Sequence, residues 1–341
     1  MNNFYYEHIV ELIAQSRSIL VTSHYNPDGD AIGSALAMAA LLRKSGKNAV
    51  VMVPNDYPAF LKWMPGNDKV MIYRNNEEKA KEVIRLADII FCLDYSALNR
   101  TDSMEEALRN SPAKKILIDH HLEPVLADFD YYLSVIQTSS TSELVYRFAE
   151  GCSWLDKIDP EIATGLFVGI MTDTGSFSFS CNYPETFRIT ASLIQAGINP
   201  EQIHRNVYDT YSENRLRLLG YCLSEKLTVM AELNTAYIAL SKDELYRFQH
   251  QVGDTEGIVN YALSIENIKI AVLMTERKDR IRLSFRSKGD FSVNRIAREH
   301  FNGGGHKNAA GGDSFVSLEN TILKLREVLT QYKEEIDRSS N

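Results

Sequence analysis

Four short apolar runs of strand length alternate with helical patterns in the first 195 residues. The runs are Ile19–Thr22, Ala49–Val53, Ile89–Leu93 and Ile116–Ile118. Their unbroken hydrophobicity is typical of strands that are covered on both faces. Helical patterns such as Ala31–Lys44, which Gly46 closes as a C-terminal cap, and Pro160–Met171 lie between or after them. The alternation predicts an α/β fold with a doubly wound, mostly parallel sheet and crossover connections.

The pattern changes after about residue 219, and a length of 341 residues favours two domains over one. Strand-like runs now alternate with shorter helical segments, which predicts a smaller mixed α/β domain. The runs are Leu227–Ala231, Ala236–Leu240, Ile268–Met274 and Arg280–Phe285, and the helical segments are Ser241–Gln249, Thr255–Leu263 and Val293–Glu299. We therefore expect a first domain over 1–195, a helical linker over 196–219 and a second domain over 220–341. The active site is expected in the cleft between the two domains.

Side chains of the kinds that bind metal ions follow several of the elements in the first domain. They are His24, Asp28, Asp30, Asp94, Asp119, His120, His121 and Asp173. Ligands of doubly wound folds collect at the carboxyl ends of the strands, so we expect these groups to meet at that edge of the sheet. Carboxylates and neutral imidazoles suit a divalent ion, and a mixed set suits Mn²⁺ better than Ca²⁺. The sequence predicts a two-metal site that hydrolyses a phosphate ester.

Composition limits the class of protein. No apolar run approaches the roughly 18 residues that span a bilayer, and the N-terminus lacks the basic and then apolar pattern of a signal peptide. The four cysteines are widely spaced and form no Cys-x-x-Cys pair, so we expect reduced, buried thiols. These features predict a cytoplasmic protein with no membrane partner. A net charge of −8 opposes a role in coating long nucleic acid.

The segment 277–307 is basic, in contrast to the whole chain: it contains nine Lys or Arg residues and three acidic ones. From Arg280 to Lys288 the basic residues stand at even-numbered positions and the apolar residues at odd-numbered ones, as in a half-buried strand. This basic face either binds a short phosphorylated substrate or is solvated. A glycine-rich loop follows at 303–312, with five glycines in ten residues, which requires close approach of other atoms or positive φ.

Each motif also has a plain structural interpretation. The His-x-x-x-Asp-x-Asp pattern occurs in turns, and Asp28 or Asp30 can cap the following helix. Ser140-x-x-Glu143 is typical of a helix capping box, although the nearby Thr138 and Ser139 could touch substrate. Four segments that converge on one topological position favour the metal site over these separate explanations. The chain contains neither Gly-x-x-x-x-Gly-Lys-Ser/Thr nor Gly-x-Gly-x-x-Gly, which weighs against a triphosphate or dinucleotide cofactor.

Together these motifs resemble the DHH phosphoesterases. The match includes Ser23-His24-x-x-Pro27-Asp28-Gly29-Asp30, the strand end at Asp94, the triplet Asp119-His120-His121 and Asp173-Thr174-Gly175, in that order. Gly304-Gly305-His306 resembles a loop of the C-terminal domain associated with this family. The compact two-domain layout is similar to that of the bacterial nano-RNases. Those enzymes degrade very short oligoribonucleotides and remove the 3′-phosphate of adenosine 3′,5′-bisphosphate.

The resemblance implies two Mn²⁺ ions per site, with Mg²⁺ or Co²⁺ as possible replacements. It assigns His24, Asp28 and Asp94 to one ion and Asp30, Asp94, His120 and Asp173 to the other, so that Asp94 bridges them. His121 is expected to contact a phosphoryl oxygen or to protonate the leaving alkoxide, and Asp119 to fix a ligand imidazole. The resemblance places Arg286 and His306 on the substrate and assigns backbone N–H groups of Gly304 and Gly305 to its terminal phosphate.

The expected function is that of a manganese-dependent phosphodiesterase and phosphatase. It would hydrolyse very short oligoribonucleotides to mononucleotides and adenosine 3′,5′-bisphosphate to AMP, as an oligoribonuclease and bisphosphate nucleotidase. Hydrolysis of cyclic di-AMP or its linear dinucleotide is the alternative, and pyrophosphate or polyphosphate hydrolysis is less favoured. The expected partners are short RNA or small phosphorylated nucleotides as substrates. An edge strand of the second domain is compatible with a homodimer.

Overall fold

The computed structural model describes residues 4–340 and divides into two compact units, Met1–Thr210 and Tyr211–Asn341. The first unit contains a parallel sheet of six strands in the order β3-β2-β1-β4-β5-β6. The strands are β1 Ser18–Thr22, β2 Asn48–Val53, β3 Met71–Ile72, β4 Ile89–Leu93, β5 Lys114–Asp119 and β6 Tyr131–Ser134. The strand order reverses between β1 and β4, which makes the sheet doubly wound, as expected.

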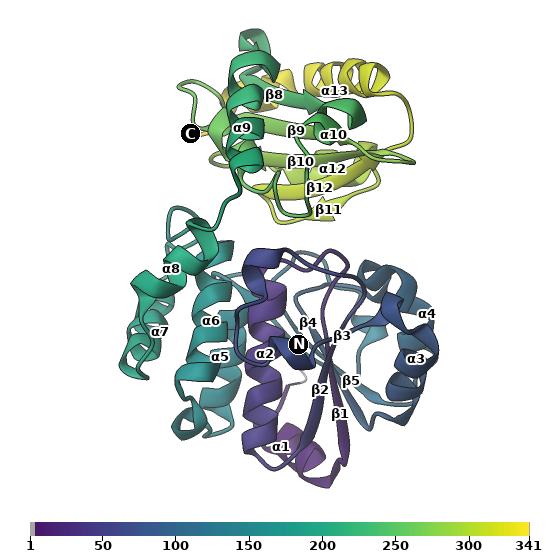
Figure 1. Ribbon diagram of the computed structural model, residues 1–341, viewed down its shortest axis with the longest axis vertical. Coiled ribbons are helices and arrows are strands. Elements are labelled where there is room, and N and C mark those ends of the chain that lie inside the picture. Colours follow the sequence, from purple (N-terminus) through teal and green to yellow (C-terminus); the bar gives the residue numbers. More distant parts are fainter. Residues whose placement is uncertain (1–3, 341) are drawn as a thin grey trace. The chain divides into compact units, whose positions relative to one another are not determined.

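Helices cover both faces of this sheet (Figure 1). The helices of the first unit are α1 Tyr6–Gln15, α2 Gly29–Lys44, α3 Glu77–Leu86, α4 Glu105–Arg109, α5 Thr141–Gly151, α6 Pro160–Asp173, α7 Pro184–Gln195 and α8 Pro200–Tyr208. Successive strand residues point to opposite faces: Ile19 and Val21 join the cluster under α2, α5 and α6, whereas Leu20 joins the cluster under α3 and α4. Burial on both faces explains why the strands are apolar throughout.

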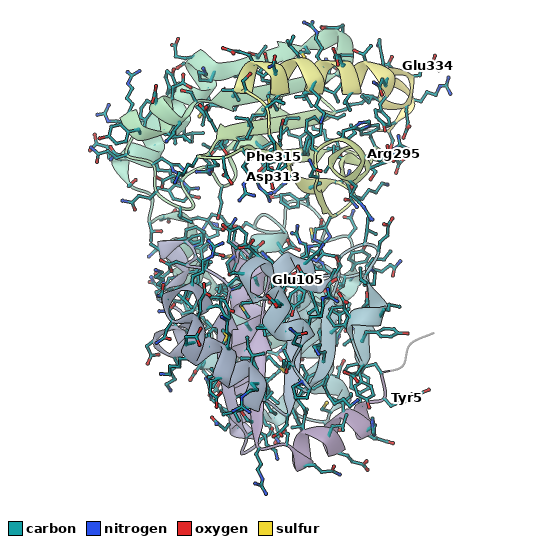
Figure 2. The ribbon with its side chains drawn as sticks, turned by 90° about the vertical axis from the view of Figure 1, so that its right-hand side faces the viewer. Tyr5, Glu105, Arg295, Asp313, Phe315 and Glu334 are labelled. Atoms are coloured by element: carbon teal, nitrogen blue, oxygen red, sulfur yellow. The ribbon has the colours of Figure 1, made fainter. Side chains whose placement is uncertain are left out.

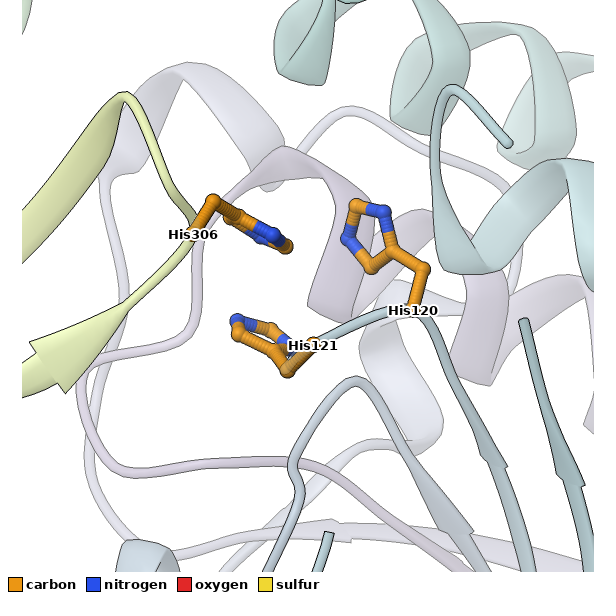
Figure 3. Close-up of side chains that lie close together, drawn as sticks. All are labelled: His120, His121 and His306. Atoms are coloured by element: carbon orange, nitrogen blue, oxygen red, sulfur yellow. The ribbon is translucent and has the colours of Figure 1, made fainter. Parts of the chain in front are cut away.

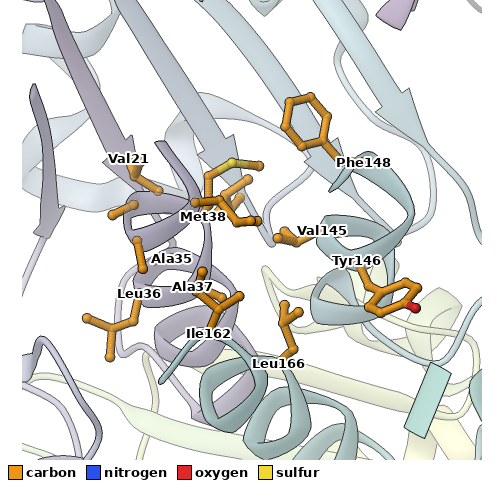
Figure 4. Close-up of a cluster of buried hydrophobic side chains, with 14 of the residues drawn as sticks. Val21, Ala35, Leu36, Ala37, Met38, Val145, Tyr146, Phe148, Ile162 and Leu166 are labelled. Carbon is orange, nitrogen blue, oxygen red and sulfur yellow. The ribbon is translucent and has the colours of Figure 1, made fainter. Parts of the chain in front are cut away.

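The larger cluster is the main core of the first unit (Figure 4). Val21 from β1, Met38 from α2, Val145 and Phe148 from α5, and Leu166 from α6 are all buried there. Helix α2 contributes mainly small residues to this core. Its first twelve residues read Gly-Asp-Ala-Ile-Gly-Ser-Ala-Leu-Ala-Met-Ala-Ala. Small side chains allow helices to approach closely and bury nearly the whole of α2.

Glycines form the crossing of α2 with α6. A Cβ on Gly33 would lie 2.4 Å from the carbonyl oxygen of Gly165, and one on Gly165 would lie 2.8 Å from that of Gly33. Nearer the start of α2, a Cβ on Gly29 would lie 2.3 Å from Oγ1 of Thr172. The two backbones are therefore in direct contact at this crossing, which holds the first turn of α2 beside the last turn of α6.

The second unit contains a mixed sheet in the order β11-β12-β10-β9-β8-β7. Its strands are β7 Leu227–Met230, β8 Thr235–Leu240, β9 Ile270–Glu276, β10 Ile281–Ser287, β11 Gly304–Gly305 and β12 Ala309–Ser314. Only β8 and β9 pair in parallel among these strands. Its helices are α9 Glu213–Tyr221, α10 Lys242–Arg247, α11 Ile258–Leu263, α12 Val293–His300, α13 Leu318–Gln331 and α14 Lys333–Arg338. The expected alternation holds in β10, where Ile281, Leu283 and Phe285 are buried and Arg282 and Arg286 are partly exposed.

Two segments show details that the sequence analysis did not give. The glycine-rich segment is not only a loop, because Gly304–Gly305 and Ala309–Ser314 pair as strands β11 and β12. Other atoms approach the backbone of this segment closely, as expected: a Cβ on Gly303 would lie 2.0 Å from the carbonyl oxygen of Gly311. The segment 196–219 divides between the units, since Ile203 of α8 lies in the core of the first unit and Leu218 of α9 in a core of the second.

The surface carries scattered apolar side chains, including Tyr5 before α1 and Phe315 after β12 (Figure 2). Among residues 4–340, no helix combines the length and the apolar composition that crossing a membrane requires. All four cysteines are free thiols, and burial raises the pKa of Cys92, Cys152 and Cys222 to about 12. These three thiols therefore stay protonated at neutral pH.

Candidate metal and active site

The ends of β1 and β4 lie side by side where the strand order reverses. β1 pairs with β4 up to Thr22 and Cys92, so His24 and Asp94 leave the sheet at neighbouring positions. β5 is the next strand after β4 and leads into His120 and His121. Loops diverge at such a reversal and leave room for a ligand. The topology therefore brings residues 24, 94 and 120 together, although they are far apart in the sequence.

The first group of side chains contains His24, Asp28 and Asp94. Nε2 of His24 lies 3.5 Å from Oδ2 of Asp94 and 3.9 Å from Oδ2 of Asp28. Nδ1 of His24 lies 2.9 Å from the carbonyl oxygen of Tyr25, and a hydrogen bond there leaves the Nε2 lone pair facing the carboxylates. Asp28 also caps α2, because its Oδ1 accepts hydrogen bonds from the N–H groups of Asp30 and Ala31.

The second group contains Asp30, Asp94, His120 and Asp173. Nε2 of His120 lies 3.4 Å from Oδ2 of Asp173, 3.5 Å from Oδ1 of Asp94 and 3.8 Å from Oδ2 of Asp30. The side chains of Asp30, Asp94 and His120 are at most 5% exposed, and that of Asp173 is 25% exposed. The glycine crossing of α2 with α6 brings Asp30 and Asp173 to the same point.

Asp94 belongs to both groups, with a different oxygen in each. Its Oδ2 faces His24 and its Oδ1 faces His120. The backbone of Asp94 is left-handed, with φ of 64°, a conformation that Asp and Asn tolerate better than most residues. The N–H of Asp94 still donates to the carbonyl oxygen of Ile118 on β5. The carboxylate therefore turns out of the strand direction toward both histidines.

The pKa values in the second group reflect buried charge. Burial raises the pKa of Asp30 well above its usual value and that of Asp173 to about 6, and neighbouring carboxylates add to both shifts. Burial opposes the charged form of His120, but Asp173, Asp94 and Asp30 outweigh it and raise the pKa of His120 to about 10. Burial also opposes the charge of Asp94, and the imidazoles of His120 and His24 lower its pKa well below the usual range. The group thus attracts positive charge.

His121 lies beside this group but differs from His120 in its partner. The two rings are 5.2 Å apart at an angle of 75° (Figure 3). Nδ1 of His121 lies 2.7 Å from Oδ1 of Asp119, which is fully buried at the end of β5. Asp119 was expected to fix a ligand imidazole, and it instead holds the ring of His121.

The start of α5 supplies residues whose role the sequence analysis missed. Ser140 caps the helix, but Glu143 does not return to the N–H of Ser140, so the expected capping box forms only in part. Glu143 accepts hydrogen bonds from Ser139 instead. Thr141 donates to both Asp30 and Asp94, and Ser142 donates to Asp30. The run of hydroxyl residues from 138 to 142, at the start of a buried helix, was the available signal.

The expected substrate residues lie in the second unit. Arg286 is on β10, where its Nη1 donates to the carbonyl oxygen of Phe285. Gly304 and Gly305 form β11, and the N–H of His306 donates to the carbonyl oxygen of Ala309. Of the neighbouring basic side chains, Arg280 and Arg282 both face Asp313. Phosphate binding by residues 286 and 304–306 stays a prediction.

The donor atoms of both groups fit divalent ions. In each of the sets His24, Asp28, Asp94 and Asp30, Asp94, His120, the ligand atoms lie within 4.8 Å of one another. The separations of 3.4–3.9 Å between imidazole and carboxylate atoms are longer than good hydrogen bonds. Ligands about 2.1 Å from one ion lie roughly 3 Å or more apart, so a small inward shift would complete either set.

The chain is similar to several known proteins. Residues 18–170 match the model of the DHH family, N-terminal domain, and residues 237–335 match the DHHA1 domain. A crystal structure of an exopolyphosphatase-related protein from Bacteroides fragilis is 41% identical, covers 98% of each chain and has a TM-score of 0.92. The bifunctional oligoribonuclease and PAP phosphatase NrnA of Bacillus subtilis is 27% identical over 312 residues, which are 90% of this chain and 92% of that protein.

A third relative is longer. The cyclic-di-AMP phosphodiesterase GdpP of Bacillus subtilis is 25% identical over 340 residues, which are 95% of this chain but only 49% of GdpP. The two matched domains, the extent of the similarity and the order of the histidine and aspartate motifs agree with one another. The chain belongs to the DHH family of phosphoesterases and carries a DHHA1 domain after its DHH domain.

Proposed function

We propose that this protein is a manganese-dependent phosphoesterase that hydrolyses very short oligoribonucleotides and removes the 3′-phosphate of adenosine 3′,5′-bisphosphate. The observation that carries the proposal is the pair of histidine and carboxylate groups that share Asp94. The similarity to NrnA over nine-tenths of both chains supports the choice of substrates.

The proposed ligands of one ion are His24, Asp28 and Asp94. Those of the other are Asp30, Asp94, His120 and Asp173. Two divalent ions in such a site supply an activated water and neutralise charge on the phosphoryl oxygens. The four carboxylates balance two divalent charges, whereas without cations they repel one another in a buried place. A mixed oxygen and nitrogen donor set favours Mn²⁺, with Mg²⁺ and Co²⁺ as the ions to compare.

His121 is the proposed proton donor to the leaving alkoxide. Asp119 holds its Nδ1 at 2.7 Å, so the ring is oriented, and Nε2 is the proposed donor atom. In the second unit, Arg286, His306 and the backbone of Gly304 and Gly305 are proposed to hold the substrate phosphate.

The test is a substrate panel with the purified full chain and Mn²⁺. The panel contains a dinucleotide, a pentanucleotide, a long RNA, cyclic di-AMP, adenosine 3′,5′-bisphosphate and pyrophosphate. We expect turnover of the dinucleotide, the pentanucleotide and the bisphosphate, and little turnover of long RNA. Turnover of pyrophosphate alone would contradict the proposal. Repeating the panel with Mg²⁺ and Co²⁺ tests the choice of ion.

Hydrolysis of cyclic di-AMP or of its linear dinucleotide is the second candidate. The similarity to GdpP along 95% of this chain favours it, although this chain spans only half of GdpP. Faster turnover of cyclic di-AMP than of the pentanucleotide would support this candidate over the first.

A further inference from the structure

The segment Ser139–Glu143 contains a buried carboxylate that the proposed chemistry does not use. The side chain of Glu143 is 1% exposed, and it lies at the start of α5. Its Oε2 accepts hydrogen bonds from the Oγ of Ser139 at 2.7 Å, the N–H of Ser139 at 3.2 Å and the Oγ1 of Thr186 at 2.7 Å. A buried carboxylate is unfavourable unless donors satisfy it, and here three donors converge on one oxygen.

These bonds fasten the turn before α5 to another helix. Thr186 belongs to α7, and Ser139 immediately precedes Ser140, the N-cap of α5. Glu143 therefore connects α7, its own helix and the turn through one oxygen. Ser139, Ser140 and Thr186 are fully buried. The backbone between residues 139 and 143 is thus held by contacts that do not involve the proposed metal ligands.

Thr141 and Ser142, which follow the N-cap of α5, donate backbone hydrogen bonds to Asp30. The N–H of Thr141 donates to Oδ2 of Asp30 at 2.7 Å, and the N–H of Ser142 donates to Oδ1 at 2.9 Å. Both carboxylate oxygens of Asp30 are therefore oriented by one backbone segment. Packing restricts it further, because a Cβ on Gly169 of α6 would lie 2.5 Å from Oδ1 of Asp30 and 1.9 Å from Oγ of Ser142.

Thr141 also reaches Asp94 through its side chain. Its Oγ1 donates to Oδ1 of Asp94 at 3.0 Å, on the oxygen that faces His120. The other oxygen of Asp94 is left to face His24. A hydrogen bond to one oxygen opposes rotation of the carboxylate. It therefore keeps Oδ1 facing His120 and Oδ2 facing His24. Groups that orient metal ligands in this way commonly change metal affinity or activity 10- to 100-fold when they are lost.

We infer that Thr141, held in place by the bonds of Glu143 to Ser139 and Thr186, is a positioning residue that orients Asp30 and Asp94 for the binding of two divalent cations. This inference rests on the proposed function of the two groups. Thr141 contacts no substrate in this role, and it acts only through the two carboxylates.

The experiment compares the parent chain with Thr141→Val and Thr141→Ser. Valine has nearly the same shape and keeps the backbone N–H to Asp30, but it lacks the hydroxyl, whereas serine restores the hydroxyl. Mn²⁺ binding to each full-length protein is measured by isothermal titration calorimetry. We expect Thr141→Val to weaken Mn²⁺ binding about 10-fold or more and Thr141→Ser to bind almost as the parent does.

Thr164→Val is the matched control. Its hydroxyl also makes one hydrogen bond, to the carbonyl oxygen of Pro160 at 2.7 Å within α6, and it does not bond to Asp30 or Asp94. We expect this variant to bind Mn²⁺ as the parent does. Thermal unfolding in EDTA separates positioning from damage to the fold: the inference requires Thr141→Val to lose affinity while its midpoint stays close to that of the control.

The outcomes distinguish the inference from the proposed function. If the parent binds two Mn²⁺ ions and Thr141→Val binds them equally well, the inference is wrong and the proposed function stands. If Thr141→Ser fails to restore binding, the hydroxyl is not the cause and the inference is also wrong. If the parent binds no Mn²⁺, the proposed function fails first and this inference falls with it.

Discussion

At the scale of single residues, Asp94 offers a clean test of the shared carboxylate. Its φ of 64° is a conformation that asparagine also tolerates, so Asp94→Asn removes the charge with little change in the backbone. The change leaves both histidine groups without their common anion. We expect activity on every substrate to fall by more than about 100-fold, with weaker Mn²⁺ binding by calorimetry.

Asp102→Asn is the control for this variant. Asp102 also has a positive φ, of 50°, and its partner is Arg74, so it is not one of the proposed ligands. Activity near that of the parent is expected for Asp102→Asn. Full activity in Asp94→Asn would show that the two groups do not depend on a bridging charge.

Asp119 gives a second test, of proton transfer rather than metal binding. The bond from His121 to Oδ1 of Asp119 orients the ring. We expect Asp119→Asn to lower kcat by about 100-fold or more while Mn²⁺ affinity stays unchanged. Steady-state kinetics and calorimetry on the same preparation measure both quantities. A parallel loss of Mn²⁺ affinity would instead place Asp119 among the metal ligands.

At the scale of helices and strands, the glycine crossing of α2 with α6 is the feature most sensitive to substitution. Gly33→Ala would place a methyl group 2.4 Å from the carbonyl oxygen of Gly165, and neither backbone can yield without moving a helix. We expect the free energy of unfolding to fall by about 2–4 kcal/mol. Urea denaturation followed by circular dichroism measures the change.

Gly220→Ala on α9 is the matched control, because nothing lies within 4 Å of the added methyl group. Alanine favours a helix over glycine, so this variant should be more stable by about 0.5–1 kcal/mol. If Gly33→Ala were as stable as Gly220→Ala, the close helix crossing would be refuted.

Glu244 on α10 predicts a pH dependence. Partial burial acts to raise its pKa, but Tyr221, the N–H of Ser241 and Lys226 outweigh burial and lower the pKa of Glu244 to about 2. A carboxylate with a lowered pKa stabilises the folded state above its unfolded pKa, and this stability is lost as pH falls through the folded pKa. The contribution is therefore complete above about pH 4.5 and declines toward pH 2.

The variant Glu244→Gln should lose this contribution. We expect it to be less stable than the parent by about 2 kcal/mol at pH 7, with the difference shrinking as pH falls from 5 toward 2. Denaturant midpoints measured across this range test the expectation. A difference that stays constant with pH would show that the charge of Glu244 does not stabilise the second unit.

The helices and strands also show what could be predicted from sequence. β1, β2, β4 and β5 were recognised because burial on both faces requires unbroken apolar runs. The edge strand β3 has only two residues, and β12 reads Ala-Ala-Gly-Gly-Asp-Ser. Neither therefore shows the pattern of apolar residues that is typical of a strand. Their pairing depends on neighbours far along the chain, which no local pattern reveals.

The candidate ligands were recognisable for a similar reason, since each stands at the end of an apolar run or a helix. The hydrogen bonds of Thr141 were not recognisable. They join residues 47 and 111 positions apart, and the local pattern around Ser140 suggested a capping box instead. Local chemistry thus indicated the candidate ligands but not the groups that donate hydrogen bonds to them.

At the scale of the whole molecule, the proposed metal ligands all belong to the first unit, and this predicts where cations change the dynamics. Carboxylates that repel one another without cations should be held more firmly when ions bind. We expect Mn²⁺ to slow amide hydrogen exchange in residues 24–31, 94–96, 118–121 and 141–143. Exchange in β8 of the second unit should change little, which mass spectrometry can resolve.

EDTA-treated protein provides the reference state for this measurement, and Asp94→Asn provides the control. In Asp94→Asn, Mn²⁺ should protect these segments much less. Equal protection in both units of the parent would indicate a general effect of salt on the fold rather than cation binding by the first unit.

The bare contact between α2 and α6 has a consequence for the choice of ion. Asp30 and Asp173 lie on these two helices, and their distance depends on the contact between Gly33 and Gly165, which are not proposed ligands. Widening that contact by one methyl group would separate the oxygens and favour a larger ion over a smaller one. At the proposed metal site, a change inside the helix pair would therefore alter which cation size fits, without replacing any of the proposed ligands.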